Sequence, residues 1–134
     1  MLRNYFNMGS DYKWDGKTIL IVDDEYVNFL LFEAILEDTG TKLIHASNGE
    51  KAVQECLKNN DIDLVLMDIK MPVLDGYEAT KKIKETRKNL PVIAQTAYTA
   101  SEDYYKCMSS GFDEYIPKPI ERELLLFKIS NFFN

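Results

Sequence analysis

Acidic residues follow two apolar runs of the sequence. Asp23 and Asp24 come directly after Thr18–Val22, and Asp68 follows Asp63–Met67. If these runs are neighbouring parallel strands, their carboxyl ends meet at one edge of a sheet. Carboxylates gathered there repel, and a pair about 4 Å apart costs on the order of 4 kcal/mol at an effective dielectric near 20. We therefore expect a cation, and Mg²⁺ is the ion that best suits carboxylate, carbonyl and phosphate oxygens.

Two further groups stand at the ends of later apolar runs. Thr96 follows Pro91–Gln95, and Lys118 lies just beyond Asp113–Ile116. An Asp-Asp pair after a strand is by itself more often a helix cap than a reactive site. Acids, a hydroxyl and an amine on four separate strand ends are much more specific, because they place complementary groups around one site.

The elements that must position these residues alternate along the chain. Continuous apolar, β-branched runs are typical of strands covered on both faces. We predict strands at Thr18–Val22, Lys42–Ala46, Asp63–Met67, Pro91–Gln95 and Asp113–Ile116. We predict helices from about Val27 to Gly40, from a capping pattern at Ser47–Glu50 to Asn59, from Gly76 to about Arg87, from Thr99 to Gly111, and from Ile120 to about Phe132.

Five such repeats predict a doubly wound α/β fold with one parallel sheet and helices on both faces. Pro117 cannot donate a ladder hydrogen bond, so the fifth strand should lie at an edge. This agrees with the strand order 2-1-3-4-5, in which ligands bind between the first and third strands.

The first helix is apolar on much of its circumference. We predict that its core stripe is Val27, Leu30, Leu31, Ala34 and Ile35. A second row, Phe29, Phe32 and Leu36, lies beside it. Either the buried face is wide, or the second row is a docking surface for a histidine-bearing helix bundle.

Composition narrows the class of protein. The 134 residues fit one domain, of which we expect 1–16 to be a linker or tag and 17–134 the folded part. Sixteen basic against 22 acidic residues give a net charge of −6, which argues against a nucleic-acid partner. Cys56 and Cys107 lack the spacing of a disulfide framework or zinc site, so we expect buried or neutral thiols in the cytoplasm.

From Lys17 to the C-terminus the chain resembles the receiver domains of two-component response regulators. The motifs that carry the resemblance are Ile-Leu-Ile-Val-Asp23-Asp24-Glu25, Leu-Val-Leu-Met-Asp68-Ile-Lys-Met-Pro72-Val-Leu-Asp-Gly76, Ala-Gln-Thr96-Ala97 and Tyr115-Ile-Pro-Lys118-Pro119. This resemblance implies a flavodoxin-like receiver fold in which Asp68 takes a phosphoryl group from a phosphohistidine.

The resemblance also assigns roles around Asp68. It implies that Asp24, Asp68 and the backbone carbonyl of Lys70 bind Mg²⁺, or Mn²⁺ in its place, with Asp23 holding a metal-bound water. Lys118, the Thr96 hydroxyl and the Ala97 amide would hold phosphoryl oxygens. Tyr115 would rotate when Thr96 moves, Glu25 and Pro119 would be structural neighbours of the site, and the Lys118–Pro119 bond would be cis.

The implied partner is a histidine kinase or a histidine phosphotransfer domain. Val27-Asn28 and Asp75-Gly-Tyr-Glu-Ala-Thr80 are similar to receivers fused to hybrid sensor histidine kinases, so we expect a free-standing receiver or a fragment of such a kinase. A membrane would then be reached only through the parent kinase. A homodimer through the fourth helix, fifth strand and fifth helix stays open.

Other functions remain to be weighed. A pseudo-receiver would bind partners without phosphorylation. An aspartyl-nucleophile phosphohydrolase would want a second Asp two residues after Asp68, where Lys70 stands. An FMN module would need a Ser/Thr/Gly-rich loop in place of Asp23-Asp24-Glu25. His45 is expected to be structural and away from the site, and Tyr104, Tyr105 and Phe112 are expected to pack.

Overall fold

The computed structural model describes residues 12–97 and 101–133. Five parallel strands form one sheet in the order β2-β1-β3-β4-β5. The strands are β1 (Thr18–Val22), β2 (Lys42–Ala46), β3 (Leu64–Asp68), β4 (Val92–Thr96) and β5 (Glu114–Pro117). The predicted fold class and strand order are confirmed, and Pro117 lies on an edge strand.

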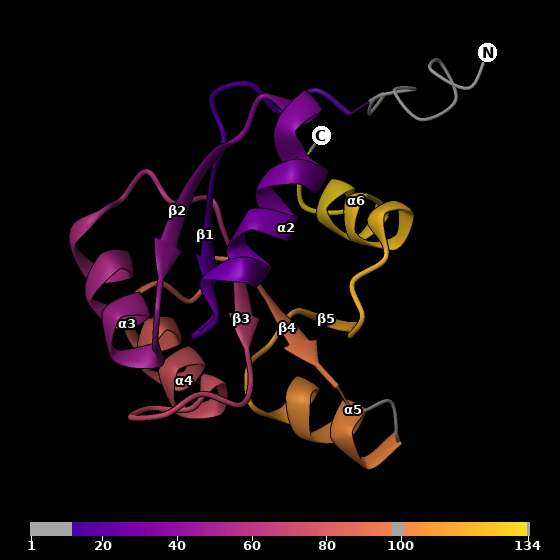
Figure 1. The fold of residues 1–134 in the computed structure, drawn as a ribbon. Coiled ribbons are helices and arrows are strands. Elements are labelled where there is room, and N and C mark those ends of the chain that lie inside the picture. Colours follow the sequence, from indigo (N-terminus) through magenta and orange to yellow (C-terminus); the bar gives the residue numbers. More distant parts are fainter. Residues whose placement is uncertain (1–11, 98–100, 134) are drawn as a thin grey trace.

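Helices cover both faces of the sheet (Figure 1). The helices are α2 (Tyr26–Leu36), the 3₁₀ helix η1 (Glu37–Thr39), α3 (Gly49–Lys58), α4 (Gly76–Thr86), α5 (Ser101–Ser109) and α6 (Arg122–Ser130). The cap of α3 is Asn48, whose side chain accepts from the Lys51 N–H at 2.8 Å. The predicted start of the helix before Ser101, at Thr99, lies outside the described residues.

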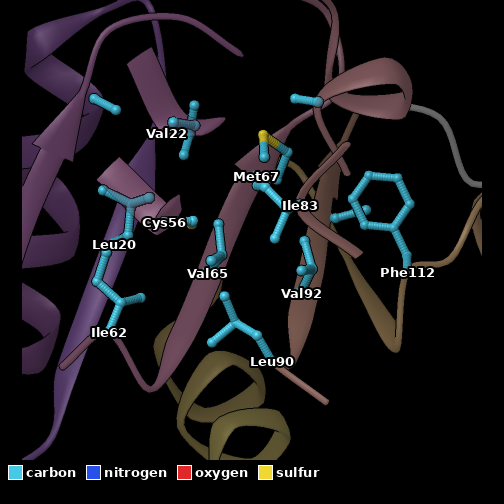
Figure 2. Close-up of a cluster of buried hydrophobic side chains, with 14 of the residues drawn as sticks. Leu20, Val22, Cys56, Ile62, Val65, Met67, Ile83, Leu90, Val92 and Phe112 are labelled. Atoms are coloured by element: carbon cyan, nitrogen blue, oxygen red, sulfur yellow. The ribbon is translucent and has the colours of Figure 1, made fainter. Parts of the chain in front are cut away.

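Two hydrophobic clusters fill the space between sheet and helices. One cluster lies under α3, α4 and α5, where Val65, Met67 and Ile83 are fully buried (Figure 2). The other lies under α2 and α6 and contains Phe32 and Leu125. β1, β3 and β4 are buried along their whole length, as their continuous apolar runs predict.

The predicted core stripe of α2 is wrong, except for Ile35. Val27 is 64% exposed, Leu30 and Leu31 are each 44% exposed, and Ala34 is also exposed. The second row faces the core instead, because its two phenylalanines, Phe29 and Phe32, fill more of the space over the sheet than smaller side chains could. We call Val27, Leu30, Leu31 and Ala34 the α2 ridge.

Residues of the expected N-terminal linker also pack. Trp14 is only 4% exposed, stacks on Tyr12 at a ring-centroid distance of 5.2 Å, and meets Phe133 edge-on at 5.5 Å. Its backbone N–H donates to the Thr39 carbonyl at 2.7 Å. We propose that the folded unit includes Tyr12 and Trp14, which lie before the boundary expected at Lys17.

Among the described residues, no helix has both the length and the apolar character needed to cross a bilayer.

Trp14→Ala should lower the free energy of unfolding by about 3 kcal/mol, because it leaves a cavity against Phe133. Trp14→Phe should cost clearly less, and Tyr105→Ala, at a side chain 69% exposed, should change little. Urea unfolding followed by circular dichroism measures all three. Equal stability of Trp14→Ala and the wild type would place the boundary back at Lys17.

Candidate functional site

Three carboxylates converge where β1 and β3 end. Val22 pairs with Met67, so the residues that follow them, Asp23 and Asp68, leave adjacent strands at the same edge. Carboxylate oxygens of Asp23, Asp24 and Asp68 all lie within 4.8 Å of one another. The structure thus brings together the predicted acids from two separate parts of the sequence.

Asp23 is fully buried and held from several directions. Its Oδ1 accepts from the Glu25 backbone N–H at 2.9 Å, and the Asn28 amide lies 3.1 and 3.2 Å from its two oxygens. His45 Nε2 lies 2.8 Å from the Asp23 carbonyl oxygen, which can only accept, so this ring nitrogen carries the proton. These contacts fix both the side chain and the backbone of Asp23.

Asp68 is 5% exposed, and among the described residues Lys118 is the cation that forms an ion pair with it. Its Oδ1 lies 3.2 Å from Lys118 Nζ and accepts from the Lys70 backbone N–H at 3.3 Å. Burial raises the pKa of Asp68; Lys118 opposes this shift, and the charge of Asp23 adds to it. The carboxylate is therefore only partly compensated, as suits a group that binds a cation and an electrophile.

The ends of β4 and β5 bring Thr96 and Lys118 to the same edge. Thr96 is 3% exposed, and its carbonyl accepts from the Lys118 backbone N–H at 2.7 Å. The Lys118–Pro119 peptide bond is cis, as predicted. Ala97, the next residue after Thr96, is exposed.

Tyr115 lies on β5 and is half-buried. Its ring meets the Tyr104 ring edge-on at a centroid distance of 5.5 Å. Lys128, on α6, places its Nζ 4.5 Å from the centroid of the Tyr115 ring. Lys128 also donates to the Tyr115 carbonyl at 2.6 Å. Tyr115 therefore joins α5, β5 and α6, the elements that correspond to the predicted fourth helix, fifth strand and fifth helix.

The donor set fits a hard divalent cation. At separations within 4.8 Å, two carboxylates repel by about 3 kcal/mol at an effective dielectric near 20. Among the three acids, Lys118 forms its ion pair with Asp68. Asp24 is exposed, so an oxygen-rich opening to solvent remains for an ion that keeps some of its waters.

Two residues that touch the site were not predicted to do so. The sequence uses Asn28 only as part of a subtype motif and predicts that His45 lies away from the site, yet both contact Asp23. The contact of Asn28 could have been predicted from the sequence, because an amide in the first helical turn after an acid pair can turn back toward that pair. The contact of His45 could not, because it depends on the pairing of β2 with β1.

Asp68→Asn should raise the melting temperature of the Mg²⁺-free protein at pH 7. A pKa raised in the folded state means that stability is lost as pH rises through that value, and asparagine removes the ionisation. The advantage should shrink as the pH falls toward the ordinary aspartate pKa of about 3.9. Scanning calorimetry with a chelator at several pH values tests this, with Asp61→Asn on the exposed surface as control. A lower melting temperature at pH 7 would contradict it.

Comparisons with known proteins bear on the family and the fold of the chain. The family model of the response regulator receiver domain matches residues 19–130 of this chain. Hybrid signal transduction histidine kinase B of Dictyostelium discoideum is 36% identical over 124 residues, which cover 83% of this chain but 6% of that kinase. The chain thus spans only a small part of this relative.

Solved structures show the same fold. The receiver domain of sensor histidine kinase PA1611 from Pseudomonas aeruginosa, with magnesium coordinated in its active site cleft, has a TM-score of 0.79 and 34% identity, covering 87% of this chain and 97% of that one. The receiver domain of Saccharomyces cerevisiae Ssk1, solved with the histidine phosphotransfer protein Ypd1, has a TM-score of 0.82 and 28% identity, covering 89% and 90%. With its acid cluster, its strand order and the match over residues 19–130, the chain belongs to the receiver domains of two-component signalling.

Proposed function

We propose that this receiver domain accepts a phosphoryl group from a phosphohistidine onto Asp68, with Mg²⁺ bound beside it. The observation that carries the proposal is the convergence of Asp23, Asp24 and Asp68 within 4.8 Å, with Lys118 on Asp68 at 3.2 Å. An acid cluster with one cation suits the transfer of a phosphoryl group more than passive binding of a partner.

In the proposed step, a carboxylate oxygen of Asp68 attacks phosphorus. A P–O bond forms and the P–N bond to the donor histidine breaks, so the imidazole nitrogen keeps the electron pair and later takes a proton. Mg²⁺ supplies neutralisation of the charge on the phosphoryl oxygens. Asp68 can act because Lys118 Nζ and the Lys70 backbone N–H contact its carboxylate and leave its charge partly uncompensated.

Other residues would hold the metal and the transferred group. Asp24, Asp68 and the carbonyl of Lys70 are proposed metal ligands, with Asp23 oriented toward a metal-bound water. The exposure of Asp24 leaves its carboxylate open to an ion from solvent, and the contacts that already hold both oxygens of Asp23 support an indirect role for that residue.

The phosphoryl oxygens would then be held by groups on β4 and β5. Lys118 is proposed to move from Asp68 to a phosphoryl oxygen, and the Thr96 hydroxyl and the Ala97 N–H to bind others. A shift of Thr96 would give Tyr115 room to rotate and so change the surface of α5, β5 and α6.

We propose that the α2 ridge docks the phosphohistidine donor, a histidine kinase or phosphotransfer domain. The ridge exposes four apolar residues on the helix whose first turn holds Asp23 through Asn28. Apolar residues at this spacing fit a groove between partner helices. The co-crystal of Ypd1 with the receiver domain of Ssk1 shows that a similar receiver does bind a histidine phosphotransfer protein.

We further propose that the chain is the receiver part of a hybrid histidine kinase and works in the cytoplasm. The kinase relatives, such as the Dictyostelium protein, support the first part. Two buried free cysteines suit a reducing compartment. The homodimer through α5, β5 and α6 stays a prediction, to which exposed Tyr105 and Phe127 on α5 and α6 would contribute.

Incubation with acetyl phosphate and Mg²⁺ should add one phosphoryl group to Asp68. Intact mass measurement followed by peptide mapping detects it. Asp68→Asn should take none, and Asp24→Ala should lose Mg²⁺ affinity by about tenfold or more, because it removes a charged ligand. A wild-type protein that takes no phosphoryl group and binds no beryllofluoride would instead be a pseudo-receiver.

Leu30→Glu should slow phosphorylation by a protein donor about tenfold while leaving phosphorylation by acetyl phosphate unchanged. The charge spoils the apolar ridge, and the Leu30 side chain is exposed, whereas Asn28 is the residue of this helix that holds Asp23. Leu57→Glu, at an exposed apolar residue on α3, is the matched control and should change neither rate. Loss with both donors, or with neither, would contradict the docking role.

A further inference from the structure

Gln95 is a polar side chain inside a strand that is otherwise occupied by apolar and small residues. All five residues of β4 are buried, and Gln95 is 1% exposed. It lies on the same face as Ile93, toward the cluster under α2 and α6. An amide at such a position must find hydrogen bonds or lower the stability of the fold.

The amide group of Gln95 reaches across the sheet to two other strands. Its Nε2 donates to the Leu66 carbonyl on β3 at 3.2 Å and lies 3.4 Å from the Val22 carbonyl on β1. Val22 directly precedes Asp23, and Leu66 is two residues before Asp68. One side chain therefore contacts the backbone of both strands just before their acids.

The backbone of Gln95 adds a third connection. Its carbonyl accepts from the Ile69 N–H, directly after Asp68, at 3.3 Å. The next residue of β4 is Thr96. Gln95 thus connects β4, which ends in Thr96, to β3, which ends in Asp68, and to β1, which Asp23 follows.

The other half of the amide has no hydrogen-bond partner among the described residues. Gln95 Oε1 is buried without a donor. Gln95 also lines a pocket of about 250 Å³ between α2 and the Lys118–Ile120 segment. The amide is thus buried beside this pocket, and its two bonds to carbonyls orient it. A leucine or methionine here would leave no unmet acceptor, so stability alone does not account for the amide.

We propose that Gln95 is a positioning residue that holds the ends of β1 and β3 at the spacing that the acid cluster needs to bind Mg²⁺. The inference rests on the proposed function. Backbone shifts of a few tenths of an ångström at Val22 and Leu66 pass directly to Asp23 and Asp68, because each carbonyl lies within two residues of its acid.

Gln95→Met tests the proposal, because it nearly preserves volume and removes the donor. We expect the melting temperature without Mg²⁺ to stay equal or rise, while Mg²⁺ affinity measured by titration calorimetry falls about tenfold and the rate with acetyl phosphate falls with it. Gln95→Asn keeps an amide that is one methylene too short to reach Val22 and should also bind Mg²⁺ more weakly.

Ile93→Val, on the same strand and face, is the matched control and should leave Mg²⁺ affinity unchanged. Wild-type Mg²⁺ affinity in Gln95→Met would overturn the positioning role. If the melting temperature of Gln95→Met fell while its Mg²⁺ affinity stayed at the wild-type value, the amide would be structural only. A wild-type protein that neither binds Mg²⁺ nor takes a phosphoryl group would overturn the proposed function itself.

Discussion

The repulsion among Asp23, Asp24 and Asp68 is the constraint on which the rest of the structure depends. Oxygens of like charge within 4.8 Å of one another persist only where surrounding groups hold them. The neighbouring parallel strands β1 and β3 bring the acids together, Asn28 and the Glu25 N–H hold Asp23, and Lys118 arrives from the end of β5. The unbalanced charge that remains is the property on which the proposed phosphoryl transfer depends.

Much of this arrangement could be predicted from the sequence, because the determining signals are local. The apolar runs before Asp23 and Asp68 fix the strands, and parallel strands connected by helices leave few topologies. The acids, Thr96 and Lys118 each stand at a strand end, so their meeting follows from the strand order.

The parts that could not be predicted depend on distant contacts. Both faces of α2 are apolar at helical spacing, so periodicity could not decide that Phe29 and Phe32 point inward while Leu30 and Leu31 face solvent. The burial of Trp14 depends on Phe133 at the other end of the chain. The bonds of Gln95 run to two other strands, so no local pattern around it could reveal them.

The contact between Trp14 and Phe133 brings the entry and exit of the described chain to one place (Figure 1). That place lies where β1 begins, whereas the acids lie where β1 ends. Any polypeptide joined at either end would hold the domain, like a tether, from the end opposite the acid cluster. Such a tether would raise the local concentration of the domain near a linked partner without covering the acid cluster. The two aromatic rings thus set the direction in which the domain can be presented.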